Sequence, residues 1–188
     1  VVIAKDHVVL MNNTENGADA PQRASWTNIG QTQDFINGTA GYQDLTDEAS
    51  AIIASEQLSD NQWAIYKGGA VVVMEWVGGQ TPFRFTTMIK GKTIAGKASV
   101  VNMDGTHYVI GTKELYKYSG GKEAPAIDDK IKRYFFSTVD YSYILRSFVA
   151  WHEEDDELQF WIPTASAYPD KVFCLDTLLD VWYVKSRT

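Results

Sequence analysis

The sequence predicts an antiparallel all-β protein. Aromatic residues make up 13% of the 188-residue chain, and their large flat side chains favour the pleated, half-buried surface of a sheet. Phe83, Phe85, Thr87 and Ile89 fall on one face of an extended segment, and residues 157–162 alternate in the same way. Gly-Gly and Asp-Gly pairs separate such short apolar runs, which is typical of strands joined by hairpins.

Further short β-rich runs are predicted along the chain, each bounded by residues that favour turns. Asp104-Gly105 is the strongest two-residue hairpin signal, and the acidic run 153–156 predicts a second, solvated hairpin tip. The other predicted strands lie at 7–11, 63–67, 70–77, 99–103, 107–110, 115–118, 143–152, 171–175 and 181–185.

Two segments could be helical. Ile127, Ile131 and Phe135 recur every four residues, and the two acidic residues at 128–129 suit a helix N-terminus, so one short helix is predicted near 127–137. Residues 46–58 fit either a helix with Thr46 as its N-cap or a strand, because the run at 51–54 is compatible with both.

A coarse repeat underlies these elements. A strand, a polar turn and a second strand recur around Asp6, Asp60, Asp104 and Asp155, at a spacing of about 45–50 residues, the length of one four-stranded propeller blade. The pattern predicts a small or incomplete β-propeller, with a β-sandwich as the alternative. The blade-like units of this single β domain would span 1–50, 51–97, 98–142 and 143–188.

Charge and composition argue against several classes of protein. The net charge of −7 argues against a dedicated nucleic-acid binder, because affinity for DNA comes mainly from clustered Lys and Arg. Cys174 is the only cysteine, so the chain can form no internal disulfide and must depend on its core. No apolar run approaches the ~20 residues that span a bilayer. Because the chain starts at Val1 and not at Met, we expect it to be part of a longer one.

Few residues form a pattern that is typical of a catalytic or metal-binding site. His7, His107 and His152 lie far apart and lack metal-ligand spacing. The acidic run after His152 has no Gly for the sharp turn of a calcium loop, and Cys174 lies in an apolar strand, where a buried, inert thiol is expected. We therefore predict no catalytic residue, no metal and no cofactor.

The chain resembles β-propeller-type structural proteins of the tail or neck of tailed phages, such as tail nozzle, tubular or hub proteins. In residues 21–30 an Arg-x-x-Trp segment, PQRASWTNIG, precedes Asp34-Phe35 and an Ala-Gly-x-x-Asp-Leu segment at 40–45. The similarity extends over most of the chain. It includes a Tyr-Lys-Gly turn at 66–68, a Phe-x-Phe strand at 83–85, a strand running into proline at 158–163, and the strands at 172–176 and 181–183.

The resemblance implies a virion component, made in the host cytoplasm, that forms a homo-oligomeric ring with other tail proteins around the channel for DNA. Arg23, Trp26, Gly41 and Asp44 would then define the fold of the family-like segment and would not take part in chemistry. A surface with a net charge of −7 would let DNA pass without specific binding, because carboxylates repel a polyanion.

Two other functions remain as alternatives. A carbohydrate-binding propeller could use its six Trp residues as platforms for host-surface glycans, although packing between blades fits their place in strands better. A propeller glycosidase would need two carboxylates about 5–10 Å apart, and the Asp-Gly-Thr turn at 104–106 resembles the Asp-box turn of sialidases only faintly.

Overall fold

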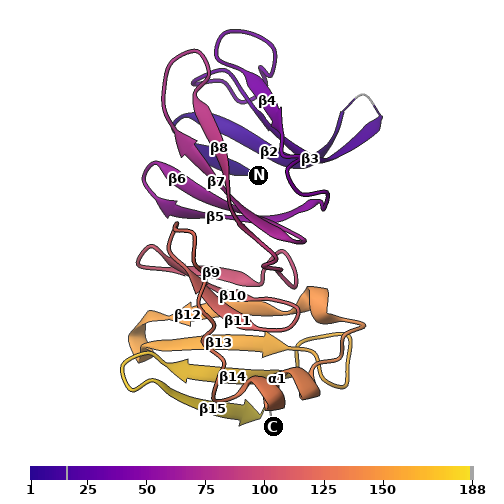
Figure 1. The fold of residues 1–188 in the computed structure, drawn as a ribbon, viewed down its shortest axis with the longest axis vertical. Coiled ribbons are helices and arrows are strands. Elements are labelled where there is room, and N and C mark those ends of the chain that lie inside the picture. Colours follow the sequence, from indigo (N-terminus) through magenta and orange to yellow (C-terminus); the bar gives the residue numbers. More distant parts are fainter. Residues whose placement is uncertain (16, 187–188) are drawn as a thin grey trace. The chain divides into compact units, whose positions relative to one another are not determined.

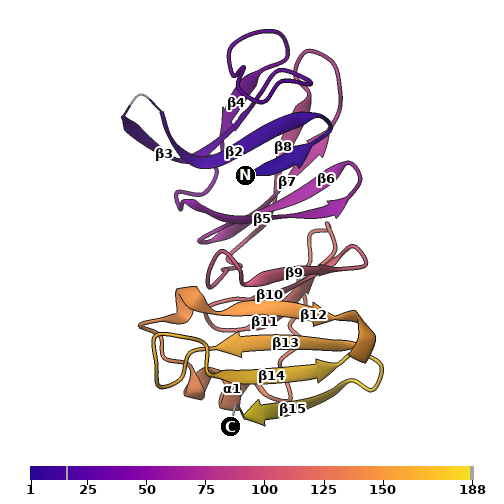
Figure 2. The same cartoon turned by 180° about the vertical axis from the view of Figure 1, so that it is seen from behind.

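The computed structural model of the chain describes residues 1–15 and 17–186, and its elements are drawn in Figures 1 and 2. The chain divides into two compact units, Val1–Lys92 and Thr93–Thr188. Each unit contains two small antiparallel sheets, so the predicted antiparallel all-β fold is confirmed. The four sheets fall within the ranges 1–50, 51–97, 98–142 and 143–188.

The first sheet is a meander in which each strand pairs with the next one along the chain. Its strands are β1 (Val2–Ala4), β2 (His7–Glu15), β3 (Ala18–Trp26) and β4 (Gly41–Asp44). The β2–β3 ladder changes register between Met11 and Asn13, and Asn12 has a φ of 52°, in the left-handed region that Asn tolerates. Pro21 lies opposite this irregularity, where a residue without an N–H is accommodated.

The second sheet is another four-stranded meander. It contains β5 (Ile52–Ser59), β6 (Gln62–Lys67), β7 (Ala70–Trp76) and β8 (Phe83–Lys90). The ambiguous segment 46–58 is therefore a strand from Ile52 onward and not a helix. The central strands β6 and β7 are buried along most of their length, which explains why their sequences are nearly continuous apolar runs.

The two sheets of the first unit share one hydrophobic core. The side chains of this core come from all the strands except β4 and from Leu45 just after β4. Aromatic rings pack in edge-to-face geometry at its centre, with the Trp26 and Phe83 centroids 5.6 Å apart. The buried members are Ala4, Val9, Trp26, Leu45, Ile52, Trp63, Ile65, Val72, Met74 and Phe83.

The third sheet, in the second unit, has three strands and a marginal fourth. β9 (Val100–Met103), β10 (Thr106–Ile110) and β11 (Leu115–Tyr118) form the sheet, and an isolated antiparallel bridge joins Tyr116 to Ala126 on its outer side. The segment that follows β11 thus returns alongside it without becoming a regular strand.

The predicted helix near 127–137 is present as α1 (Lys132–Thr138). It begins later than the sequence pattern indicated, because Asp128 does not cap it. The Asp128 Oδ2 atom instead accepts a hydrogen bond from the Leu115 backbone N–H at 2.9 Å, and the helix begins without a side-chain cap. Asp128 therefore attaches the helix segment to β11.

The fourth sheet is the meander β12 (Phe148–His152), β13 (Glu157–Ile162), β14 (Lys171–Asp176) and β15 (Val181–Ser186). The predicted strand at 143–152 is wrong in its first half, where the chain forms the 3₁₀ helix η1 (Ile144–Arg146). A local turn explains the difference, because Asp140 Oδ1 accepts the Ser142 N–H at 2.9 Å and the Asp140 carbonyl accepts the Tyr143 N–H at 3.0 Å.

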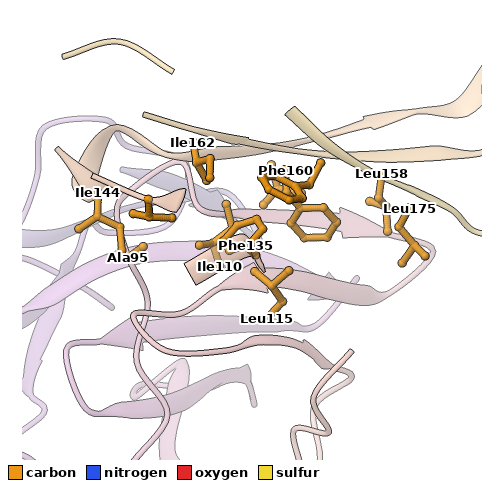
Figure 3. Close-up of a cluster of buried hydrophobic side chains, with 12 residues drawn as sticks. Ala95, Ile110, Leu115, Phe135, Ile144, Leu158, Phe160, Ile162 and Leu175 are labelled. Carbon is orange, nitrogen blue, oxygen red and sulfur yellow. The ribbon is translucent and has the colours of Figure 1, made fainter. Parts of the chain in front are cut away.

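The core of the second unit lies between its two sheets and includes the helix (Figure 3). Phe135 of α1 is fully buried, and its ring centroid lies 4.8 Å from that of Phe173 in β14. The helix therefore contributes one aromatic anchor to a core otherwise made mostly by strands. The buried members are Ala95, Ile110, Leu115, Phe135, Val139, Ile144, Val149, Leu158, Phe160, Ile162, Phe173 and Leu175.

An acidic residue marks the first hairpin of every sheet. Asp6, Asp60, Asp104 and Asp156 each follow the first strand of a sheet and precede the second. Asp6, Asp104 and Asp156 have φ values of 63°, 51° and 50°, which Asp tolerates better than most residues. In the fourth sheet the turn also contains the 3₁₀ helix η2 (Glu153–Asp155), so the predicted hairpin tip at 153–156 is present.

Candidate functional site

The second unit contains an open cleft of about 540 Å³. Strands β10, β11 and β15, the end of β14 and the loop 125–130 contribute to its walls. Aromatic, charged and hydroxyl groups converge there, as they do in pockets that bind small polar ligands. Its polar and aromatic residues are Tyr108, Lys117, Asp129, Lys130, Thr177, Asp180 and Trp182.

An ion pair closes one side of this cleft. The Lys130 Nζ atom donates to Asp180 Oδ2 at 2.6 Å and to the Asp180 carbonyl oxygen at 3.0 Å. Both side chains are mostly exposed, so the pair adds little to stability. Its effect is to attach the loop after β11 to the turn before β15.

The aromatic side chains that line the cleft are partly buried against the core. Trp182 is half-buried, and its ring centroid lies 5.2 Å from that of the core residue Phe160. The Tyr108 phenol is neutral at pH 7, because burial raises its pKa further above the ordinary value of 10.0. A flat indole, a neutral phenol and two ammonium groups suit a polar ligand that stacks and accepts hydrogen bonds, such as a sugar ring.

The sequence did not bring the residues of this cleft together. In the sequence, Trp182 is one of six tryptophans with no feature that sets it apart, and Lys130 lies in a short basic stretch, KIKR at 130–133, that is typical of a solvated surface. Lys130 and Asp180 are 50 positions apart, so no local spacing could have linked them. The residues of the cleft come together only in the folded second unit, where β15 pairs with β14.

The four residues predicted to define the fold of the family-like segment form two neighbouring pairs on β3 and β4. Arg23 is the register partner of Asp44, and Trp26 is the partner of Gly41. The Arg23 guanidinium donates to both Asp44 oxygens, from Nε at 2.7 Å and from Nη2 at 2.8 Å. Such a bidentate pair fixes geometry as well as charge, and it links the two strands across the sheet.

Arg23 also joins β3 to β2. Its Nη1 atom donates to Glu15 Oε2 at 2.8 Å, and its guanidinium carbon lies 3.9 Å from the centroid of the Tyr42 ring. Hydrogen bonds from Arg23 hold the pKa of Asp44 below its ordinary value. The pKa of Glu15 is lowered by hydrogen bonds from Asn13, Ser25 and Arg23. The carboxylates stay ionised near neutral pH, so the cluster acts as a brace across three strands.

The second pair depends on the absence of a side chain. A Cβ atom at Gly41 would lie 2.9 Å from Trp26 Cζ2, closer than carbon atoms approach without displacement. The Trp26 ring lies over this glycine, and its Nε1–H donates to the Thr39 carbonyl at 2.8 Å. The indole is therefore satisfied and locked, as a buried Trp requires.

A buried lysine holds the connection between the two sheets of the first unit. Lys67 is 1% exposed, and its Nζ atom donates to the backbone carbonyls of Leu45 and Glu48. The Glu48 carboxylate lies 3.8 Å away. Burial lowers the pKa of Lys67, and the nearby carboxylates oppose that shift. The side chain thus caps the loop that leads from β4 to β5.

A second buried charge lies in the fourth sheet. The Lys185 Nζ atom donates to both Glu157 carboxylate oxygens at 2.8 Å, and Gln159 Nε2 donates to Glu157 Oε1 at 2.6 Å. Burial alone would raise the pKa of Glu157, but these donors and Cys174 hold it below its ordinary value. Burial and the Glu157 charge raise the pKa of Cys174 to about 12. Cys174 is therefore a thiol at neutral pH.

The remaining residues that could act in catalysis, metal binding or ligand binding lie apart from one another. His7 and His107 are buried, whereas His152 is exposed beside the tip of the β12–β13 hairpin. Within residues 1–15 and 17–186, no three His, Cys, Asp or Glu side chains gather closely enough to hold a metal ion. Of the tryptophans, Trp26 and Trp63 are in the core, and the other four are half-buried.

Comparison with known proteins gave no family assignment. No protein-family profile matches the sequence, and no curated protein is significantly similar to it. In the part of the chain that the structure describes, no helix has the length and apolar character needed to cross a bilayer.

Proposed function

We propose that the chain is a non-catalytic structural component of a phage virion, which builds an oligomeric ring in the tail or neck through which DNA passes. The observation that carries the proposal is the recurrence of one building unit, an antiparallel meander whose first hairpin turns at an acidic residue. Repeated meanders suit assembly because each leaves sheet faces that its neighbours must bury.

The same observation supports a propeller-like arrangement of the sheets. A propeller blade is a four-stranded meander, and three of the four sheets have this form in the described residues. In the third sheet, the bridge between Tyr116 and Ala126 lies where the fourth strand of a blade would pair. Consecutive sheets share a core within each unit, as consecutive blades do.

The use of charged side chains also favours a structural role. Arg23 braces three strands, Lys67 caps a connection, and Lys185 neutralises a buried carboxylate. Each of these groups is already satisfied by partners in its own unit. Such groups stabilise a rigid part more readily than they serve a reaction, which needs groups free to exchange protons or bind substrate.

Sedimentation velocity tests the assembly directly. Over a wide range of protein concentrations we expect a discrete oligomer of several copies, and a monomer at every concentration would contradict the proposal. The net charge of −7 further predicts that a fluorescent DNA duplex stays unbound even at low salt, because carboxylates repel phosphates. If the acidic residues lay outside a basic channel in the assembled ring, the idea of DNA passage would fail.

A second candidate function is glycan binding, and the cleft beside Trp182 favours it. If host-surface polysaccharide stacks on this indole, titration should quench the Trp fluorescence of the wild type. Trp182→Phe should remove that quenching, whereas Trp151→Phe should retain it, because Trp151 is half-buried in the same unit but does not line the cleft. Equal quenching in both variants would exclude this site.

A further inference from the structure

The two ends of the fourth sheet carry different surfaces. At one end lie η1 and the loop 163–170, and at the other lie η2 and the turn 177–180 (Figures 1 and 2). Strand β12 runs from η1 to η2. Its five residues separate the ends by roughly 17 Å at about 3.3 Å per residue.

The first end exposes several large aromatic and apolar side chains. Tyr141, Leu145 and Tyr168 are 52%, 71% and 72% exposed, and Tyr143 is 38% exposed. Together with Arg146 they form what we call the Tyr–Arg end. Tyr and Arg are, with Trp, the side chains enriched at the energetic centres of protein interfaces, so the composition of this end suits a docking surface.

Arg146 holds the Tyr–Arg end in one shape. Its Nη1 atom donates to the Ala167 carbonyl at 2.7 Å, which ties η1 to the loop 163–170. Its guanidinium carbon lies 5.6 Å from the Tyr143 ring centroid and 5.5 Å from that of Tyr168, within range of cation–π attraction. The surface is therefore preorganised, which lowers the entropy cost of binding a partner.

The acidic residues at this end are occupied by their own loops. Asp140 Oδ1 accepts the Ser142 N–H at 2.9 Å, and Asp170 accepts the Thr164 N–H at 2.8 Å and the Ala165 N–H at 3.2 Å. Their carboxylates stabilise turns and do not pair with Arg146. The exposed Arg146 guanidinium uses Nη1 on Ala167 and keeps its other N–H groups for an anionic partner.

The opposite end combines negative charge with exposed leucines. Glu153, Glu154 and Asp155 are exposed in η2, and Leu178 and Leu179 are 75% and 71% exposed in the neighbouring turn. We call these five residues the acidic end. The Asp176 Oδ1 atom accepts the N–H groups of both leucines at 3.0 Å and 2.8 Å, which fixes the turn from which they project.

We propose that the acidic end of one copy docks on the Tyr–Arg end of a second copy. The carboxylates complement the Arg146 guanidinium, and Leu178 and Leu179 complement the exposed Tyr rings. Because the two surfaces differ, every docked copy still presents one free surface of each kind. Such a head-to-tail contact adds further copies until the rotation closes into a ring. The inference rests on the proposed function and assigns the surface through which it operates.

Charge reversal at either end tests the contact in the full chain. Arg146→Glu changes the Tyr–Arg end, and the triple variant Glu153→Lys/Glu154→Lys/Asp155→Lys changes the acidic end. Lys122→Glu is the matched control, since it reverses an exposed charge in the same unit at neither end. Sedimentation velocity should show self-association weakened about tenfold or more in both test variants and unchanged in the control.

Mixing the two test variants sharpens the experiment. Each retains the surface that the other has lost, so the mixture should associate more strongly than either variant alone. Leu178→Ser/Leu179→Ser provides a variant without charge change, which should also weaken association, and circular dichroism verifies that each variant is folded. If a charge-reversal variant fails to fold, the leucine variant decides.

The outcomes separate this inference from the proposed function. If the wild type forms oligomers and all the variants do so equally well, the head-to-tail contact is wrong and the assembly role survives. If the wild type stays monomeric, both fail. If the variants dissociate but their mixture does not recover, the two ends do not bind each other and the inference is overturned.

Discussion

Removal of Lys185 should destabilise the second unit by leaving the Glu157 carboxylate buried without its cation. The Glu157 side chain is 3% exposed, and Lys185 is 47% exposed. Breaking a buried ion pair by deleting one partner costs about 3–5 kcal/mol. The exposure of the lysine and the remaining hydrogen bond from Gln159 reduce that cost, so for Lys185→Met we expect a loss of about 2–3 kcal/mol at pH 7.

The variant should also reverse the sign of a pH dependence. In the wild type the pKa of Glu157 lies below its ordinary value of 4.5. Its ionisation therefore contributes stability above that pH, which is lost as the pH falls through the folded-state pKa. Without Lys185, burial should raise the folded-state pKa of Glu157 above 4.5. Stability should then fall as the pH rises through that window, because the unfolded chain releases the proton first.

Urea unfolding at pH 4 and at pH 7, followed by circular dichroism, measures both effects. The penalty of Lys185→Met should be small at pH 4 and reach its full size at pH 7. In Glu157→Gln/Lys185→Met the penalty should not grow with pH, because the buried acid is gone. A penalty of Lys185→Met that is the same at both pH values would refute the reasoning.

Three further perturbations probe the rest of the fold. Gly41→Ala should cost about 1–3 kcal/mol, because its Cβ would lie 2.9 Å from Trp26, whereas Gly121→Ala has no atom nearer than 4.0 Å and should be nearly neutral; thermal unfolding compares them. Lys67→Met should cost about 2–4 kcal/mol by leaving one buried and one partly buried carbonyl without a donor, and an unchanged urea midpoint would exclude that role. Burial raises the pKa of Tyr118 from 10.0 to about 12, so stability should fall by about 2–3 kcal/mol as the pH rises through this window; tyrosinate absorbance should show early ionisation if Tyr118 is in fact accessible.

The elements that could be predicted from the sequence are those set by neighbouring residues. Alternating side chains and the Asp-Gly turn at 104–105 encode the hairpin of β9 and β10. The four-residue spacing of Ile127, Ile131 and Phe135 predicted a helix in the right region, although only Phe135 lies within α1. The strand expected at 143–152 is wrong at its start, because Asp140 accepts local hydrogen bonds from the Ser142 and Tyr143 N–H groups, which favour a turn over the β propensity of the run.

The candidate sites depend on contacts that no local pattern reveals. Lys130 meets Asp180 across 50 residues, and Lys185 meets Glu157 across 28. Buried charges are also rare enough that a lysine in a strand is first assigned to the surface, as Lys67 would be. The sheet register decides which face such a side chain occupies, and the packing of the two sheets in each unit decides whether that face is buried.

Electron microscopy of the full chain at concentrations that support association tests the central claim most directly. A particle with rotational symmetry, made of several copies around an open centre, is the result that a ring-building structural protein predicts. A field of single copies, with no larger particle at any concentration, would contradict the account.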